Sequence, residues 1–336
     1  MKKIIIPFIA ALFFCGCQKE LRIDDSEGNS IMVLNAVPSA GKRAFVNFTN
    51  THFFLDDNGS HPVQGAALTL YINGVPYSPD SVSRCKYFFP DTLREDDQLE
   101  IDITSPSGNV HAETYVPKFP AISATTPPSR WASPTFNFYY LPLKLSDHAG
   151  YKEIYSINVM QRDSGMRYDA WTHTYDTVDT IHSSYFAFLG DNSDITSNEV
   201  SPNVALADML YGGLMFLDRR IDGQQNYLIE LCIPIFKDTT EVVDSEHAFK
   251  HWYTVNVESI TEDRFWYLIS VARNNSMTSF FAEQAQPYSN VEGALGIFAG
   301  AAKWQKIFDT DTTPEIPIPM PVAMPSEALL KSAPRL

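Results

Sequence analysis

Apolar and polar residues alternate one by one along many short segments of this chain, and this period of two constrains the fold more than any other feature of the sequence. Successive side chains of a β-strand point to opposite faces, so such segments predict strands that are buried on one face. Asn73-Gly74, a strong signal for a two-residue hairpin turn, follows one of them. The clearest segments in the first third of the chain are 31–36, 44–48, 68–72, 99–104 and 110–116. With no helical pattern between them, they predict a β-sandwich of immunoglobulin-like or transthyretin-like type.

The second half of the chain repeats the strand pattern and adds one predicted helix. Alternation recurs at 155–159, 227–233 and 253–257. Apolar residues then recur at helical spacing, at Phe265, Leu268, Ile269 and Ala272. Ser259 or Thr261 is expected to cap this helix, because Ser259 and Glu262 have the spacing of a capping box. We therefore expect a mainly β protein, with a larger β-rich domain that carries one packed amphipathic helix.

Two proline-rich stretches suggest how the chain is divided. Proline donates no backbone hydrogen bond and disfavours sheet interiors, so each stretch is interpreted as a connector or an extended tail. The apolar residues of the second stretch, such as Ile316 and Val322, suggest that this tail lies along the body. The predicted organisation is a signal peptide at 1–16, a lipidated tether at 17–30, a β-sandwich domain at 31–118, a connector at 119–135, a β-rich domain at 136–308 and a tail at 309–336.

The N-terminus has the pattern of a bacterial lipoprotein signal. Two lysines precede the apolar run 4–14, which is shorter than the roughly 20 residues that a membrane span needs. Gly16 supplies the small residue that a lipoprotein signal peptidase requires before the modified Cys17, whereas Cys15 follows a bulky phenylalanine. Acyl chains such as palmitate on Cys17 would anchor the mature chain, at about 0.8 kcal/mol for each buried CH₂ group. The alternative is an ordinary secretory signal with incidental cysteines.

The residues behind this cysteine and the overall charge bear on location and partners. Lys19-Glu20 resembles the signal that sends Bacteroidota lipoproteins to the cell surface, although a solvated tether explains the same residues. A formal net charge of −15 repels phosphate backbones and argues against nucleic-acid binding. Cys85 and Cys232 remain after processing, and we expect two buried thiols rather than a disulfide.

The sequence carries no strong catalytic or cofactor motif, so we expect neither an enzyme nor a cofactor. His247 and His251 would share one face of a helix and could bind a metal there, but a solvated loop explains them as well. The acidic stretch 56–59 lacks the spacing of a calcium loop and predicts a turn. Aromatic groups either belong to the core or line a face for a glycan, peptide or chelate; they are Phe138-Tyr139-Tyr140, Phe265-Trp266-Tyr267 and Phe280-Phe281.

Four stretches together resemble one protein family. They are the lipoprotein signal with Lys19-Glu20 before the segment 31–36; the sandwich segments Tyr71-Ile72-Asn73-Gly74, 99–104 and 110–117; Phe216-Leu217-Asp218 with Ile221-Asp222-Gly223 and Tyr227; and Asn290-Val291-Glu292-Gly293-Ala294-Leu295-Gly296-Ile297-Phe298. The last is the most specific. On these residues the chain is similar to the uncharacterised Bacteroidota lipoprotein family known as domain of unknown function 4249 (DUF4249).

This resemblance implies a context and some candidate residues. Members of the family tend to be encoded beside TonB-dependent outer-membrane receptors, and no catalytic residues are attached to it. Asn290, Glu292, Gly293 and Gly296 are candidates for a ligand-facing or an architectural role, since the glycines suggest a close approach of backbones. We therefore expect an outer-membrane surface lipoprotein that serves as a binding or accessory subunit of a TonB-dependent nutrient importer. The alternative is an adhesion or surface-assembly protein whose tail adds a strand to a neighbour's sheet.

Overall fold

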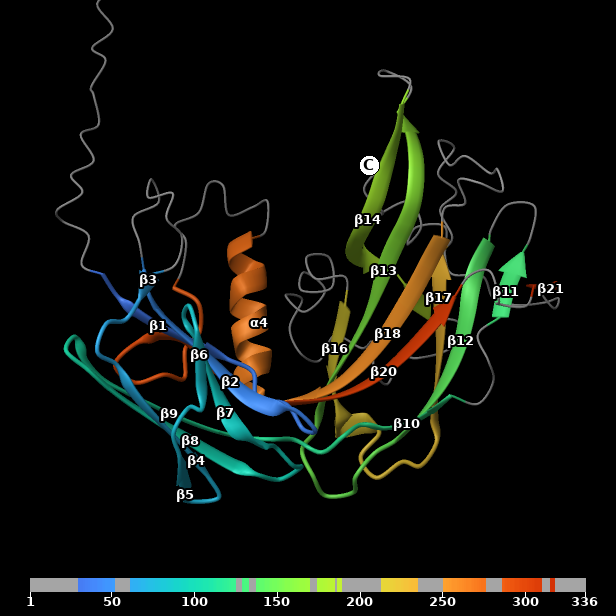
Figure 1. Ribbon diagram of the computed structural model, residues 1–336. Helices are drawn as coiled ribbons and strands as arrows, with labels where there is room; N and C mark the ends of the chain where they lie inside the picture. The colour runs from blue at the N-terminus through green and yellow to red at the C-terminus, as the bar shows by residue number, and fades with distance from the viewer. Residues whose placement is uncertain are drawn as a thin grey trace, which may run out of the picture.

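The computed structural model describes residues 30–51, 61–124, 129–132, 137–169, 174–184, 186–188, 213–234, 250–275, 286–309 and 315–317. Several residues singled out above lie outside these ranges, namely Cys17, Lys19-Glu20, the stretch 56–59, His247 and Phe280-Phe281. Within them the chain forms four sheets and one α-helix (Figure 1), which confirms the predicted mainly β fold. No helix in this part of the chain combines the length and the apolar character that crossing a bilayer requires.

The first sandwich packs two sheets around one hydrophobic core. Sheet I has the order β19 (Leu295–Phe298), β1 (Met32–Ala36), β2 (Arg43–Asn50), β7 (Lys86–Thr92) and β6 (Ser81–Ser83), with β3 (His61–Pro62) paired to β2. Sheet II has the order β5 (Val75–Tyr77), β4 (Ala67–Ile72), β8 (Gln98–Ser105) and β9 (Gly108–Tyr115). The inward residues of the predicted alternating segments form the core, among them Leu34, Phe48, Leu70 and Ile101, all fully buried.

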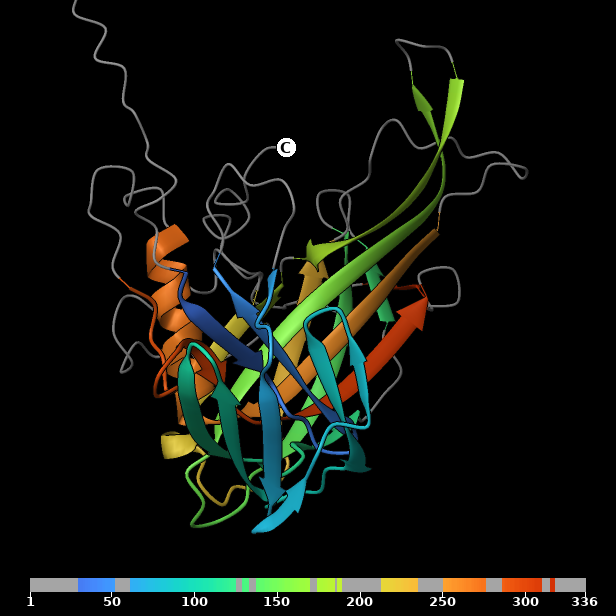
Figure 2. The same cartoon turned by 60° about the vertical axis from the view of Figure 1, so that its left-hand side comes forward.

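The second sandwich is built in the same way from the rest of the chain. Sheet III has the order β14 (Thr174–Ser184), β13 (Ile154–Asp169), β18 (Lys250–Ile260) and β20 (Ala301–Asp309), with β16 (Gly213–Leu217) paired to β13. Sheet IV has the order β15 (Ala187–Phe188), β17 (Tyr227–Pro234), β12 (Asn137–Ser146), β11 (Ser129–Ala132) and β21 (Glu315–Pro317), with β10 (Ala121–Ala124) paired to β12. Its core includes Leu141, Tyr155, Leu231 and Val257. The long β13–β14 hairpin extends beyond the sandwich (Figures 1 and 2).

The helix α4 (Glu262–Asn275) stands between the two sandwiches (Figure 1). Its apolar side, including Phe265 and Ile269, packs on Ile154, Met215, Ile260 and Ala301 at the base of sheet III, and the helix also contacts β19 of sheet I. The predicted side-chain cap is wrong. Ser259 belongs to strand β18, and the buried Oγ1 of Thr261 has no hydrogen-bond partner, because this side chain turns into the protein interior.

The two cysteines within the described residues lie in different sandwiches. Cys85 and Cys232 are both buried and neither forms a disulfide, as expected from the sequence. Part of the C-terminal tail also pairs with the body, since β21 forms a short parallel ladder with β11 at the edge of sheet IV.

Candidate functional site

The family motif 290–298 joins the two sheets of the first sandwich. Strand β19 pairs in parallel with β1 of sheet I, from Val33 opposite Leu295 to Ala36 opposite Phe298. A few residues earlier, Glu292 pairs with His111 of β9 in sheet II through two backbone hydrogen bonds of 3.1 and 2.9 Å. One segment is therefore hydrogen-bonded to both sheets and closes this edge of the sandwich. We call residues 290–300 the clasp.

Glycines line the clasp at points where no side chain fits. A Cβ on Gly293 would lie 2.1 Å from the carbonyl oxygen of Asn109, and one on Gly296 would lie 2.0 Å from that of Leu34. Both residues also adopt positive φ, 79° and 113°, which favours glycine. Gly300, which the sequence analysis missed, would place a Cβ 1.8 Å from the carbonyl oxygen of Tyr115. These glycines act architecturally, by letting the clasp approach the backbones of β1 and β9.

Asn290 closes the clasp on itself. Its Oδ1 accepts a hydrogen bond from the backbone N–H of Phe298 at 3.0 Å, and its Nδ2 donates to the carbonyl of Phe298 at 2.8 Å. The Asn290 amide thus pairs with both backbone groups of Phe298, as a neighbouring strand would. Both its donor and its acceptor are engaged, which assigns Asn290 to architecture rather than to a ligand.

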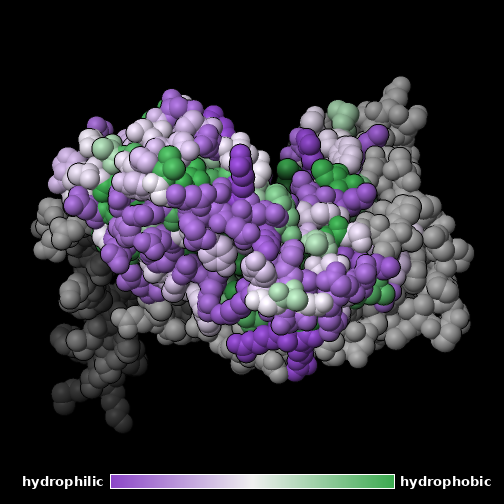
Figure 3. All heavy atoms as spheres, turned by 90° about the horizontal axis from the view of Figure 1, so that it is seen from below, coloured by the Kyte–Doolittle hydropathy of each residue, from purple (hydrophilic) through white to green (hydrophobic). Residues whose placement is uncertain are grey.

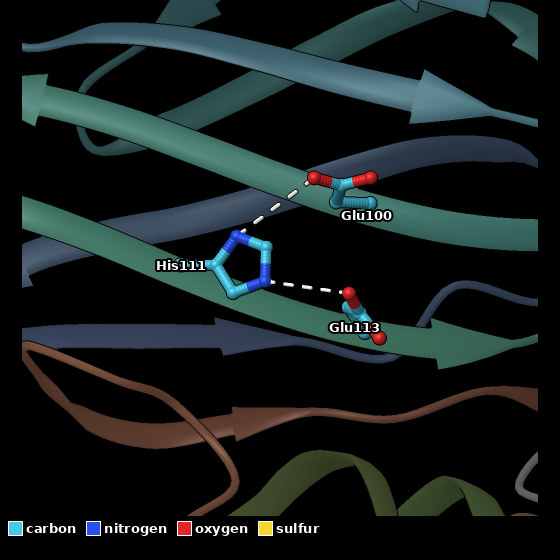
Figure 4. A group of neighbouring side chains, drawn as sticks. All are labelled: Glu100, His111 and Glu113. Atoms are coloured by element: carbon cyan, nitrogen blue, oxygen red, sulfur yellow. Dashed lines mark ion pairs between the residues drawn. The ribbon is translucent and has the colours of Figure 1, made fainter. Parts of the chain in front are cut away.

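Beside the clasp, the outer face of sheet II carries a group of ionisable side chains that we call the His111 patch: Glu100, Asp102, His111 and Glu113. Asp102 lies directly opposite His111 across β8 and β9, and Glu100 lies opposite Glu113. The Nδ1 atom of His111 is 2.8 Å from Asp102. The same atom is 3.9 Å from Glu100, and the Nε2 atom is 3.5 Å from Glu113 (Figure 4). Each nitrogen atom of the imidazole therefore has at least one carboxylate within 4 Å.

The carboxylates of the His111 patch favour a protonated imidazole. The hydrogen bond to Asp102 is the main cause that raises the pKa of His111; burial opposes it, and the charges of Asp102 and Glu100 and the contact with Glu113 make smaller contributions that also raise the pKa. Two glutamates directly opposite one another repel. A protonated His111 between them offsets part of that repulsion.

The same arrangement has the donor atoms of a cation site. One ligand atom each from Glu100, His111 and Glu113 lies within 4.8 Å of the others, and imidazole with carboxylate suits zinc and similar ions. However, these side chains are 36–72% exposed on an open strand surface. The patch is therefore a charged surface that can attract cations, not an enclosed metal centre.

A shallow depression adjoins the patch on the same face. It has a volume of about 390 Å³ and is lined by Tyr71, Gln98, Glu100, Glu113 and Tyr115 among others. The underside of the molecule, where sheet II lies, is mostly hydrophilic (Figure 3). Two tyrosines beside carboxylates can stack on a ring and accept hydrogen bonds from hydroxyl or ammonium groups.

The described residues of the aromatic groups are divided between the core and partly or fully exposed positions. Phe138 and Tyr139 are buried, and the ring of Tyr139 contacts those of Tyr253 and Phe308. Phe265 is buried on the face of α4 that packs on sheet III, whereas Trp266 of the same helix is 42% exposed. His251 belongs to strand β18 and its Nδ1 lies 2.7 Å from Asp163, so the helical spacing required for a metal pair does not apply to it.

The other family stretch lies at the base of the second sandwich. Asp218 begins the short 3₁₀ helix η1 (Asp218–Arg220) and accepts the backbone N–H of Glu153 at 2.6 Å. Asp222, in the following turn, accepts the N–H of Gly150 at 3.0 Å. Both aspartates hold the loop 147–153 in place through its backbone.

Comparison with known proteins agrees with this layout. A search of curated proteins found no match. The sequence profile of the family described as "Domain of unknown function (DUF4249)" matches residues 18–307, a span that includes the first sandwich, the helix, the clasp and most of the second sandwich. Because this match covers most of the chain, the protein belongs to the DUF4249 family.

Proposed function

We propose that the protein is a lipid-anchored binding or accessory subunit of a TonB-dependent nutrient importer, held at the outer membrane with its body facing the cell surface. The observation that carries this proposal is the lipoprotein signal ending at Cys17. Residues 18–29 separate this cysteine from Ser30, where the described body begins. Fully extended, they would span at most about 40 Å, which keeps the body close to the membrane.

The described surface supports binding rather than catalysis. The depression beside the His111 patch offers two tyrosine rings and two carboxylates, a combination that suits a glycan, a peptide amine or a charged chelate. The importer as partner follows from what the family resemblance implies about neighbouring receptors. The proposal assigns no catalytic residue and no cofactor to the chain.

The anchor is tested by Cys17→Ala in cells, with Cys15→Ala as the matched control. Loss of the acyl chains should move the protein from the membrane to the soluble fraction, whereas Cys15→Ala should leave it in the membrane. Protease treatment of intact cells should degrade the anchored body if it faces outward. A Cys17→Ala protein that still sediments with membranes would overturn the anchor.

The partner is tested by affinity capture of the tagged protein from detergent-solubilised outer membranes. A TonB-dependent receptor should be recovered with the wild type and with Cys15→Ala. Substitution of Tyr71 and Tyr115 by alanine should weaken capture of ligand without releasing the protein from the membrane. Repeated recovery of the body without any receptor would refute the accessory role.

One observation favours the alternative of adhesion or surface assembly. Residues 315–317 already act as a strand at the edge of sheet IV, so the same tail has the conformation needed to pair with a neighbour. Deletion of 309–336 should abolish assembly in that case and should be tolerated by an importer subunit. Deletion of 318–336, which leaves β21 in place, is the control.

A further inference from the structure

The loop between β12 and β13 holds ionisable groups that the proposed function does not use. Asp147 and Glu153 flank this loop and are 2% and 7% exposed, and Asp218 of η1 beside them is 3% exposed. Buried carboxyl groups are costly unless they are hydrogen-bonded or neutralised. How these groups are satisfied therefore determines what the loop can do.

The hydroxyl of Tyr155 lies between two of these carboxyl groups. It is 2.8 Å from Oδ1 of Asp147 and 2.6 Å from Oε2 of Glu153. Burial, followed by the effect of Glu153, raises the pKa of Tyr155, so the phenol keeps its proton. A phenol has one hydrogen, which cannot point along both contacts. The second contact is explained if one of the two carboxyl groups is protonated and donates a hydrogen bond to the phenol oxygen.

The remaining hydrogen bonds show which carboxyl group is the donor. Oε2 of Glu153, the oxygen that faces the phenol, accepts the backbone N–H of His148 at 3.3 Å, so this oxygen acts as an acceptor. Asp147 accepts the N–H of Gly223 at Oδ2, at 2.8 Å, which leaves Oδ1 facing the phenol. Burial is the main cause that raises the pKa of Asp147.

We propose that Asp147 carries a proton on Oδ1 in the folded protein, and that the chain Asp147 Oδ1–H to Tyr155 O–H to Glu153 is a pH-sensitive latch on the loop 147–153. No proton is transferred between the residues of the latch. Asp147 keeps its own proton on folding and releases it to solvent as pH rises. Loss of the proton leaves two buried carboxylates on one hydroxyl, which opens the latch.

Other charged groups surround the latch from every neighbouring element. Asp218 and Asp222 face it from η1 and the next turn, and burial raises the pKa of Asp218, with Asp147, Asp222 and Glu153 adding to that rise. His148 faces it from the loop itself. Lys118, beyond the end of β9, lies on the other side of the loop. Among the negative groups, Glu153 adds to the rise in the pKa of Asp147 that burial causes.

The latched loop connects three parts of the molecule. The Lys118 ammonium lies 3.6 Å from the centre of the Tyr151 ring, which joins the loop to the end of the first sandwich. Lys152 pairs with Glu262 of α4 at 2.7 Å. Opening of the latch therefore loosens the joint between the second sandwich, the first sandwich and the helix.

The test compares the wild type with Asp147→Asn, which copies the protonated state. The amide nitrogen replaces the Oδ1–H donor to Tyr155, and the amide oxygen still accepts from Gly223. The pKa of Asp147 is higher in the folded protein than in the unfolded chain, where it is about 4. The protonated Asp147 therefore contributes its full stabilisation below about pH 4, and this stabilisation is lost as pH rises towards the folded-state pKa. The unfolding constant of the wild type should therefore rise relative to that of Asp147→Asn, by up to about tenfold for each pH unit in this range.

Asp222→Asn is the matched control, since Asp222 is in the same region and accepts a hydrogen bond from this loop. The unfolding constant of Asp222→Asn should depend on pH almost as that of the wild type does. Hydrogen exchange of peptides that span 148–153 should quicken with pH, beyond the intrinsic change, in the wild type and in Asp222→Asn but not in Asp147→Asn. Parallel pH profiles for the wild type and Asp147→Asn would overturn the proposal.

Infrared titration of the wild type tests the proton without any substitution. The carbonyl band of a protonated carboxyl group should persist to higher pH than the bands of exposed carboxyl groups, whose pKa is about 4. Its absence would also overturn the proposal, whether or not the variant folds.

Discussion

Replacement of Gly293 by alanine should destabilise the protein far more than the same replacement at Gly74 or Gly150. All three glycines have a φ of 79°, so the added methyl group costs the same backbone strain of about 1 kcal/mol in each case. At Gly74 and Gly150 the new Cβ meets nothing within 4 Å, whereas at Gly293 it would lie 2.1 Å from the carbonyl oxygen of Asn109. The difference between the variants therefore isolates the close approach in the clasp.

The size of that difference follows from what must move. A Cβ contact needs about 3 Å or more, so the clasp must withdraw from β9 by close to an ångström. This breaks the two backbone hydrogen bonds between Glu292 and His111, at about 1 kcal/mol each, and exposes part of the sandwich edge. We expect Gly293→Ala to lower the free energy of unfolding by about 2–4 kcal/mol more than either control. The measurement is urea unfolding, monitored by circular dichroism. Equal losses for all three variants would refute the role of the clasp.

Three further results are expected. Asp102→Asn should lower the pKa of His111 towards its ordinary value, measured by NMR titration, because Asp102 is the main cause of its elevation; an unchanged titration would argue against that contact. Since the pKa of His111 is raised on folding, the stability that it contributes should be present below the unfolded-state pKa of about 6.5 and be lost as pH rises through the folded-state pKa, and His111→Gln should remove this dependence. Asn290→Ala should cost about 1–3 kcal/mol of unfolding free energy, measured by urea unfolding, since Phe298 loses both side-chain partners.

The strands could be predicted because burial itself has a period of two. Leu99, Ile101 and Ile103 are buried and Glu100 and Asp102 face outward, as their alternation requires. The two-residue turn between Ser105 and Gly108 then sets the register that brings Asp102 opposite His111. The His111 patch could therefore have been found from the sequence by continuing this hairpin, although its residues were not selected there.

Long-range pairings could not be predicted in the same way. Nothing local in Leu295–Phe298 indicates that this strand pairs with β1 rather than with its sequence neighbours. The pair of Asp147 and Glu153 also has no local signature, because it depends on the Tyr155 hydroxyl and on Gly223 from a distant turn. The predicted helix cap failed for a related reason, since tertiary packing decides which way Thr261 points.

The parallel pairing of β1 with β19 has a consequence for how the polypeptide acquires its structure. Strand β1 cannot pair with β19 until β19 has been synthesised, more than 250 residues later. The contact order of the first sandwich is therefore high. Until then one flank of β1 presents unsatisfied backbone groups, which invite association with other chains. We therefore expect a polypeptide that ends before residue 290 to expose this edge of β1 and to aggregate more readily than the full chain.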